Sequence, residues 1–195
     1  MDKISTIGLD LVKSVFQIHG ITEDGWVAVR RALRRSQVLD FFRQIEPCIV
    51  GIEACGSAHY WANAIGAFGH TVRLMPPAYV KPYVKRNKTD AADAEAICEA
   101  VTRPTMRFVP VKSPEEQAAG TVLKTRELLV RQRSQTANAI RGHMAELGII
   151  AAAGMSAITK LIAILRDDQD RGLPASARVA LLEMAEQIER LTEKV

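Results

Sequence analysis

The chain has 195 residues, of which 48% are hydrophobic, and this excludes a disordered chain because such a sequence can bury a core. The length favours one compact domain with a smaller second part. The net charge of +4 and a pI near 9.1 are mildly basic, so the placement of the charges is more informative than their sum.

Several classes of protein are disfavoured by particular residues. The three cysteines are odd in number and form no C-x-x-C pair, which indicates neither a disulfide framework nor a zinc knuckle, and the four histidines show no metal-ligand spacing. The start "MDKISTIGLD" lacks the apolar run of a signal peptide, and the most apolar stretch, 149–165, is interrupted by Gly154 and Lys160. We therefore expect a soluble protein of the reducing cytoplasm that makes no membrane contact.

The first third of the chain predicts a mixed sheet. Residues 4–10 and 13–20 are typical of two short strands, and an Asp-Gly turn leads into a third strand at 26–33, which predicts an antiparallel meander. Ser36 begins an amphipathic helix that ends before Pro47.

A strand at 48–54, a helix at 57–69 and a strand at 71–75 come next. Strands that alternate with helices after an antiparallel opening imply at least two parallel strands. A Pro-Pro break and a basic segment then lead into a helix from about Asp90 to Val101.

The rest of the chain predicts helices. Hydrophobic residues at heptad spacing within 115–147, and again from Leu181 to Val195, are typical either of a helical bundle core or of a coiled coil within or between chains. Gly148 and Gly154 are expected helix breaks. We predict an α/β domain over 1–112 and an all-α coiled-coil region over 113–195.

Four acidic residues occupy informative places. Asp10 ends the first strand and Glu53 ends the strand at 48–54, so adjacent parallel strands would bring both carboxylates to one sheet edge. Asp90 and Asp93 share one face of their helix, which can lie across that edge. Such a cluster is repulsive without cations, and its oxygen ligands suit two ions of Mg²⁺ or Mn²⁺ about 3.5–4 Å apart.

Each acid also has a simpler explanation. Asp90 is suited to capping its helix with Asp93 in the first turn, Asp10 to forming a turn, and Glu53 to capping the helix that starts near Ser57.

Basic residues form three clusters that favour phosphate contact, with a solvated surface as the alternative. Their members are Lys81, Lys85, Arg86 and Lys88; Arg30, Arg31, Arg34 and Arg35; and Lys124, Arg126, Arg131, Arg133 and Arg141.

The aromatic side chains Tyr60, Trp61, Tyr79 and Tyr83 are expected to pack in the core more than to stack on bases. Of these four, the sequence context predicts that Tyr83 is the most exposed.

Three segments, "IGLDLVKSVFQIHG", "GIEACGSAHYWANAI" and "KPYVKRNKTDAADAEAI", resemble the motif blocks of the DEDD-type insertion-sequence transposases, also described as bridge-RNA-guided DNA recombinases. The resemblance covers roughly residues 4–147. It implies a RuvC-like, ribonuclease-H-type fold in which Asp10, Glu53, Asp90 and Asp93 are the catalytic metal-binding quartet. It also implies DNA and a structured guide RNA as partners, and the heptads favour a homo-oligomer.

Members of that family carry a further C-terminal domain with a serine nucleophile, and we expect this chain to be a truncated form that lacks it. Two other functions remain open: a stand-alone nuclease resembling Holliday-junction resolvases, and a non-catalytic module for RNA binding and dimerisation. A sugar-kinase-like ATPase is disfavoured because bulky Leu11 and Val12 stand where a phosphate-binding loop needs small residues.

Overall fold

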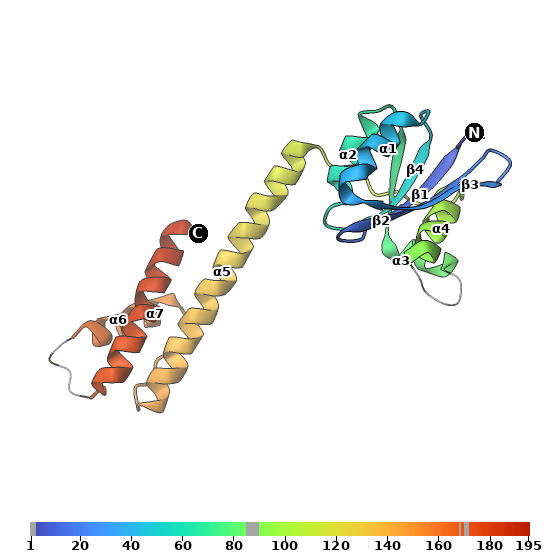
Figure 1. Cartoon of the computed structure of the whole chain (residues 1–195). Coiled ribbons are helices and arrows are strands. Elements are labelled where there is room, and N and C mark those ends of the chain that lie inside the picture. Colours follow the sequence, from blue (N-terminus) through green and yellow to red (C-terminus); the bar gives the residue numbers. More distant parts are fainter. Residues whose placement is uncertain (1–2, 85–89, 168, 170–171) are drawn as a thin grey trace. The chain divides into compact units, whose positions relative to one another are not determined.

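The computed structural model describes residues 3–84, 90–167, 169 and 172–195, with the side chain of Asp90 left out. The chain divides into two compact units, Met1–Gln117 and Ala118–Val195 (Figure 1). The first unit contains a five-stranded sheet with helices on both faces, and the second is entirely helical.

The sheet has the order β3-β2-β1-β4-β5. β2 pairs antiparallel with β1 and β3, whereas β4 pairs parallel with β1 and β5. The predicted mixed sheet of RuvC-like type, an antiparallel meander followed by parallel strands, is therefore confirmed. The strand bounds are Thr6–Asp10 (β1), Val15–Ile21 (β2), Val27–Arg34 (β3), Ile49–Glu53 (β4) and Thr71–Met75 (β5).

Helices α1 (Val38–Gln44) and α2 (Ala58–Gly66) cover one face of the sheet, and α4 (Asp90–Val101) covers the other (Figure 1). Because side chains alternate along a strand, Ile7 and Leu9 of β1 point into the core beneath α1 and α2. The predicted helix at Ser36 begins later, at Val38, because a 3₁₀ turn over Arg35–Gln37 comes first.

Two strand glycines let α4 lie close to the sheet. A Cβ atom built on Gly8 would stand 2.8 Å from the Cβ of Cys98 and closer still to backbone atoms of Ala94 and Cys98. A Cβ atom on Gly51 would stand 2.8 Å from the Cβ of Val101. Only glycine permits this approach of helix to strand.

The direction of α4 follows from the same contacts. The Cys98 thiol lies 3.8 Å from the Thr6 carbonyl near the start of β1, and Ala94 lies over Gly8 further along that strand. The helix therefore runs antiparallel to β1, and its N-terminal turn lies over the carboxyl end of β1.

After β5 the chain forms a short helix, α3 (Pro77–Val80), and a 3₁₀ turn, Lys81–Tyr83. Both follow the carboxyl end of a parallel strand, so they lie at the same edge as the ends of β1 and β4.

Helix α5 (Pro114–Glu146) has clear start and stop signals. Ser113 Oγ accepts a hydrogen bond from the Glu116 amide at 3.2 Å, and the Glu116 carboxylate accepts one from the Ser113 amide at 2.9 Å, which is a capping box with Pro114 as the first helical residue. Gly148, with φ of 83°, follows the helix end in the left-handed conformation, so the predicted break is confirmed.

The helical unit packs α5 against α6 (Met155–Arg166) and α7 (Ala175–Lys194) around one apolar core. The predicted heptad residues behave differently along α5: Ala137 and Met144 are buried, whereas Leu123 is 68% exposed. The predicted coiled coil stays a prediction. None of the described helices has the length and apolar character needed to cross a membrane.

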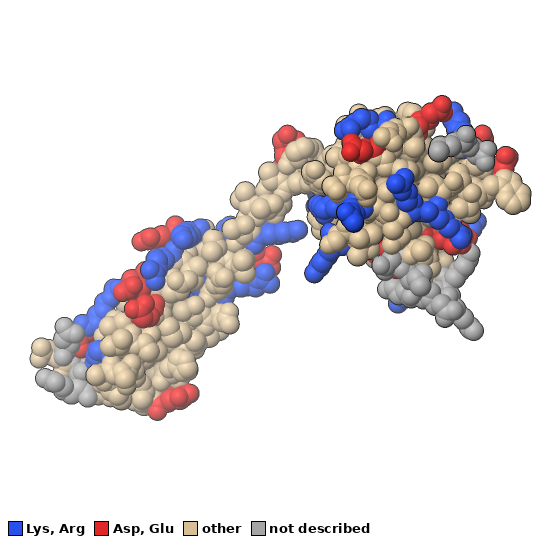
Figure 2. Space-filling view, in the orientation of Figure 1, with Lys and Arg blue, Asp and Glu red and all other residues tan. Residues whose placement is uncertain are grey.

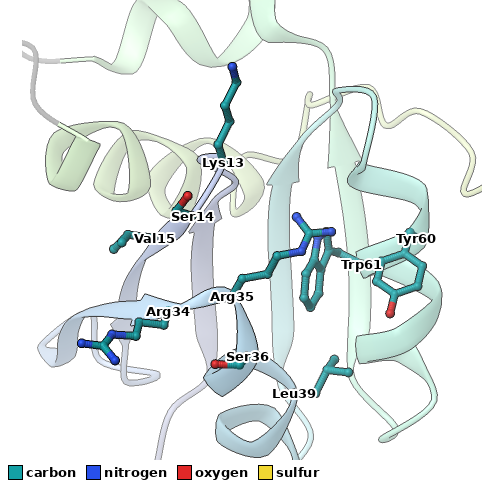
Figure 3. Close-up of a pocket in the computed structure, with 9 residues that line it drawn as sticks. All are labelled: Lys13, Ser14, Val15, Arg34, Arg35, Ser36, Leu39, Tyr60 and Trp61. Carbon is teal, nitrogen blue, oxygen red and sulfur yellow. The ribbon is translucent and has the colours of Figure 1, made fainter.

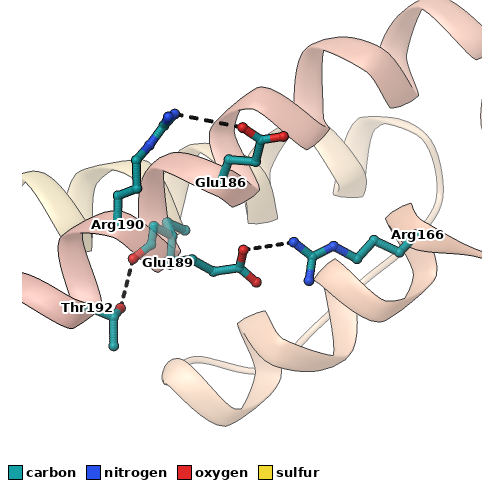
Figure 4. A network of polar contacts seen from close by, with 6 residues as sticks. Arg166, Glu186, Glu189, Arg190 and Thr192 are labelled. Atoms are coloured by element: carbon teal, nitrogen blue, oxygen red, sulfur yellow. Dashed lines mark hydrogen bonds and ion pairs between the residues drawn. The ribbon is translucent and has the colours of Figure 1, made fainter.

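Polar contacts join α6 to α7 at the surface. Arg166 donates to Glu189 at 2.7 Å, and the Glu186–Arg190 pair lies alongside on α7 (Figure 4). The hydrogen bond from Arg166 lowers the pKa of the Glu189 carboxyl.

Candidate active site at the carboxyl edge of the sheet

The two strand-end acids lie side by side. The parallel register pairs Leu9 with Ile52, so the next residues along the two strands are Asp10 and Glu53. Each acid follows a strand glycine by two positions and therefore lies on the face that α4 covers. The expectation that adjacent parallel strands would bring these residues to one edge is confirmed.

Helix α4 adds a third carboxylate from another part of the sequence. Asp93 directly precedes Ala94, the residue in contact with Gly8, and it lines one cavity of about 660 Å³ together with Asp10 and Glu53. All three acidic residues are half-buried. Asp90 is the first residue of the helix, but its side chain lies outside the described part of the structure.

The rest of the cavity wall comes from the segment after β5. Pro77, Lys81 and Val84 line it, so an exposed lysine stands at the rim of a site with three carboxylates. Lys81 is the one member of its predicted basic cluster within the described residues, because Lys85, Arg86 and Lys88 lie outside them. Pro77 and Val84 carry no chemical signal that identifies them from the sequence.

The chemistry of the donor set suits Mg²⁺ or Mn²⁺, because carboxylate oxygens are the ligands that hard divalent cations prefer. Within the described residues, however, no group of three or more histidine, cysteine or acidic side chains is close enough to hold a metal ion. The residues around the cavity therefore fit a divalent metal ion in their type and position. Their side chains do not form a complete coordination shell in the described part of the structure.

The basic residues of α5 belong to the helical unit and fall on two sides of the helix. At 3.6 residues per turn, Lys124 and Arg131 share one side, and Arg126 and Arg133 share the opposite side. Arg133 is half-buried and lines a cavity with residues of α6 and α7, as expected for the side that packs. Arg141 is also half-buried and hydrogen bonds to Asn138.

Lys124, Arg126 and Arg131 are exposed, which makes them better placed for phosphate contact than Arg133 and Arg141. Arg131 lies 4.0 Å from Glu127 on the next turn. Figure 2 shows that acidic and basic side chains are interspersed along this unit.

The aromatic predictions have mixed outcomes. Trp61 is buried, as expected, and makes edge-to-face contact with Phe16, with ring centroids 4.9 Å apart. The prediction that Tyr83 is the most exposed of the four is wrong: Tyr83 is half-buried and packs against the cluster beneath α4, whereas Tyr60 is 53% exposed. The sequence did carry a signal for the exposure of Tyr60: it lies in an amphipathic helix, on which some positions face solvent.

The cysteines of the described residues are free thiols. Burial raises the pKa of Cys48 to about 11 and that of Cys98 to about 12, so both are neutral and unreactive at pH 7, while Cys55 is exposed. The nitrogen Nδ1 of His70 accepts a hydrogen bond from the Cys48 amide at 3.1 Å, which gives this buried histidine a structural role.

Comparison with known proteins assigns the chain to a family. Residues 7–149, which run from β1 to just beyond the end of α5, match the model of the DEDD transposases of IS110 type, described as a transposase. The chain belongs to this transposase family.

Individual relatives extend the match over nearly the whole chain. A probable family 20 transposase of Pseudomonas aeruginosa is 49% identical over 98% of the chain and 57% of its own length. A putative transposase of Sinorhizobium fredii is 46% identical over 100% of the chain and 52% of its own length. The transposase for insertion sequence element IS1111A of Coxiella burnetii is 38% identical over 92% of the chain and 50% of its own length. The chain thus spans about half the length of these curated relatives.

Proposed function

We propose that the sheet-containing unit is the metal-dependent catalytic domain of a transposase that cleaves and exchanges DNA strands of an insertion sequence. The observation that carries this proposal is the parallel register of β1 and β4, which sets Asp10 beside Glu53 at the edge over which α4 brings Asp93. Membership of the transposase family supports DNA as the substrate.

Asp10, Glu53, Asp93 and Asp90 would hold two ions of Mg²⁺ or Mn²⁺. When bound, such a pair activates the attacking oxygen and stabilises the leaving oxygen in phosphoryl transfer. Lys81 at the cavity rim is placed to attract a phosphate group of the DNA, and Lys85, Arg86 and Lys88 extend the same positive segment in the sequence. The proposal also includes two partners: a structured RNA that guides the enzyme to its DNA target, and further copies of this chain that associate through the helical unit.

The test is calorimetric titration of Mn²⁺ into the full chain in the presence of a hairpin oligonucleotide, because phosphate oxygens complete the metal shell. Asp10→Asn and Asp93→Asn are compared with the original chain. The matched control is Asp24→Asn, which changes an exposed acid in the turn between β2 and β3 at the opposite edge of the sheet.

We expect both active-site substitutions to weaken the same binding event at least about tenfold, because each removes a metal ligand, and the control to leave it unchanged. Equal binding by Asp93→Asn and the original chain would show that the helix acid is not a ligand.

A second candidate function is a non-catalytic module for nucleic-acid binding and assembly. It is favoured by the lack of a preassembled three-ligand group among the described residues. The absence of any Mn²⁺ binding by the original chain would support this module over the catalytic domain.

A further inference from the structure

A second cavity lies at the same edge of the sheet as the candidate active site, on the face that α2 covers. Its volume is about 720 Å³, and three separate segments line it (Figure 3). The turn after β1 and the start of β2 contribute Lys13, Ser14 and Val15. The end of β3 and the 3₁₀ turn that follows it contribute Arg34, Arg35 and Ser36, and helices α1 and α2 contribute Leu39, Tyr60 and Trp61.

The location follows from the strand register. β1 ends at Asp10, and the turn that carries Lys13 is the next segment of chain. Arg34 is paired with Val15 at the start of β2, so the end of β3 reaches this edge as well. The second cavity and the acidic cavity share no lining residue, so they are separate sites along one edge.

The lining carries three basic residues and no acidic one. None of the described residues forms an ion pair with Lys13, Arg34 or Arg35, and all three are exposed. Their charge is therefore not neutralised by the described part of the protein. This favours an anionic ligand.

Aromatic rings form the floor of this cavity. The guanidinium carbon of Arg35 lies 5.1 Å from the centroid of the Trp61 ring, and Tyr60 lies against Trp61 with ring centroids 5.3 Å apart (Figure 3). Trp61 is 3% exposed and is fixed in place, whereas Tyr60 is 53% exposed and presents a ring to solvent. An exposed ring beside unpaired cations is suited to stacking on a base while the cations bind the flanking phosphates.

Trp61 adds an independent observation. Its indole N–H is buried and has no hydrogen-bond partner among the described residues. Buried donors without an acceptor are rare in native proteins and mark places where a water molecule or ligand completes the structure.

We propose that this cavity, lined by Lys13, Arg34, Arg35, Tyr60 and Trp61, binds a single-stranded segment of nucleic acid next to the acidic site. The proposal rests on the function proposed above. Lys13 is three residues from Asp10, so their Cα atoms are at most about 11 Å apart, a distance that a short stretch of a nucleic-acid strand can span. A strand bound here has to pass around this edge of the sheet to reach the carboxylates, which lie on the face that α4 covers.

The test is fluorescence anisotropy with labelled ten-nucleotide oligo-dT and oligo-rU, measured in EDTA at several salt concentrations. The variants are Tyr60→Ala and the double substitution Lys13→Ala/Arg34→Ala. The matched controls are Trp26→Ala, an aromatic residue 76% exposed, and Lys3→Ala, an exposed lysine paired with Glu46; both lie at the opposite edge of the sheet.

We expect Tyr60→Ala to weaken binding about fivefold or more, because one stacked base is lost. The double variant should lower the slope of log affinity against log salt by about 1.4, since two phosphate contacts are removed. Tighter binding of oligo-rU identifies an RNA strand as the occupant, and tighter binding of oligo-dT identifies a DNA strand.

Two results would overturn the proposal: binding of neither oligonucleotide by the original chain, or unchanged binding by both cavity variants with melting temperatures like that of the original chain. Because EDTA removes divalent metal, the comparison of the cavity variants with the controls does not depend on metal binding at the acidic site. The Mn²⁺ titration of Asp10→Asn and Asp93→Asn decides the acidic site separately.

Discussion

Replacement of Gly8 by alanine tests whether the close approach of α4 to β1 holds the two parts of the acidic site together. The new methyl group would stand 2.8 Å from the Cβ of Cys98, whereas carbon atoms in contact are about 3.5–4.0 Å apart. The helix must therefore move outward by roughly 1 Å. Its backbone atoms are even closer to the new group, so a change of side-chain rotamer does not relieve the overlap.

Overpacking a protein core typically lowers the free energy of unfolding by about 1–3 kcal/mol, and we expect Gly8→Ala to lie at the upper end, about 3 kcal/mol. A loss of that size is a large part of the total stability of a domain. The shift also displaces Asp93 from Asp10, because Asp93 is carried by the first turn of the same helix. We expect both the urea midpoint and the affinity for Mn²⁺ to fall.

The assay is urea unfolding followed by circular dichroism, with Gly66→Ala as the matched control. Gly66 is the last residue of α2, and a Cβ atom built there meets no atom within 4 Å, so we expect that substitution to raise stability by about 0.4–1 kcal/mol. A Gly8→Ala variant within about 0.5 kcal/mol of the original chain would refute the packing argument.

Two further predictions concern stability away from the acidic site. Burial raises the pKa of the thiols of Cys48 and Cys98, so the unfolded chain loses these protons near pH 9 whereas the folded chain keeps them up to about pH 11. The free energy of unfolding therefore falls as the pH rises from about 9 to about 11. Each thiol should contribute a slope of about 1.4 kcal/mol per pH unit, and unfolding measured under reducing conditions should show a smaller slope for Cys48→Ala/Cys98→Ala. In the helical unit, one guanidinium nitrogen of Arg178 donates to three carbonyls at the end of α6, at 2.8–3.0 Å. Arg178→Ala should cost about 1.5–3 kcal/mol in urea unfolding, and Arg178→Lys less; an unchanged midpoint for the alanine variant would contradict the capping role.

The strands and most helices were predictable because their signals are local. Alternating apolar residues mark β1, a serine followed by Pro114 and two glutamates marks the start of α5, and Gly148 marks its end. The pairing of β1 with β4 was only a condition for bringing Asp10 and Glu53 to one edge, because two strands and a helix separate β1 from β4 along the chain. The observed register meets this condition for two of the four acids.

The remaining features depend on contacts between distant residues. Nothing around Tyr83 shows that it packs under α4, and nothing around Leu123 shows that this heptad position lies beyond the reach of α6 and α7. The distance between Asp93 and the strand acids was likewise unpredictable, because it depends on Gly8 and Gly51 as much as on the acids. Spacing in the sequence predicts which face a residue occupies, but not what lies opposite that face.

The two cavities at one edge of the sheet differ in charge, which suggests different roles: binding of the nucleic-acid strand at the second cavity and metal binding at the acidic one. The acidic cavity carries three carboxylates and one lysine, so under the proposed function it would repel a phosphate chain unless metal ions were bound, whereas the charged residues of the second cavity are all cations and would attract the chain without metal. Since the turn of Lys13 follows Asp10 directly, attraction at the second cavity raises the local concentration of the strand at the first. Nucleic-acid binding without metal and metal binding without nucleic acid are therefore expected to be separable by mutation, with each one strengthening the other when both are present.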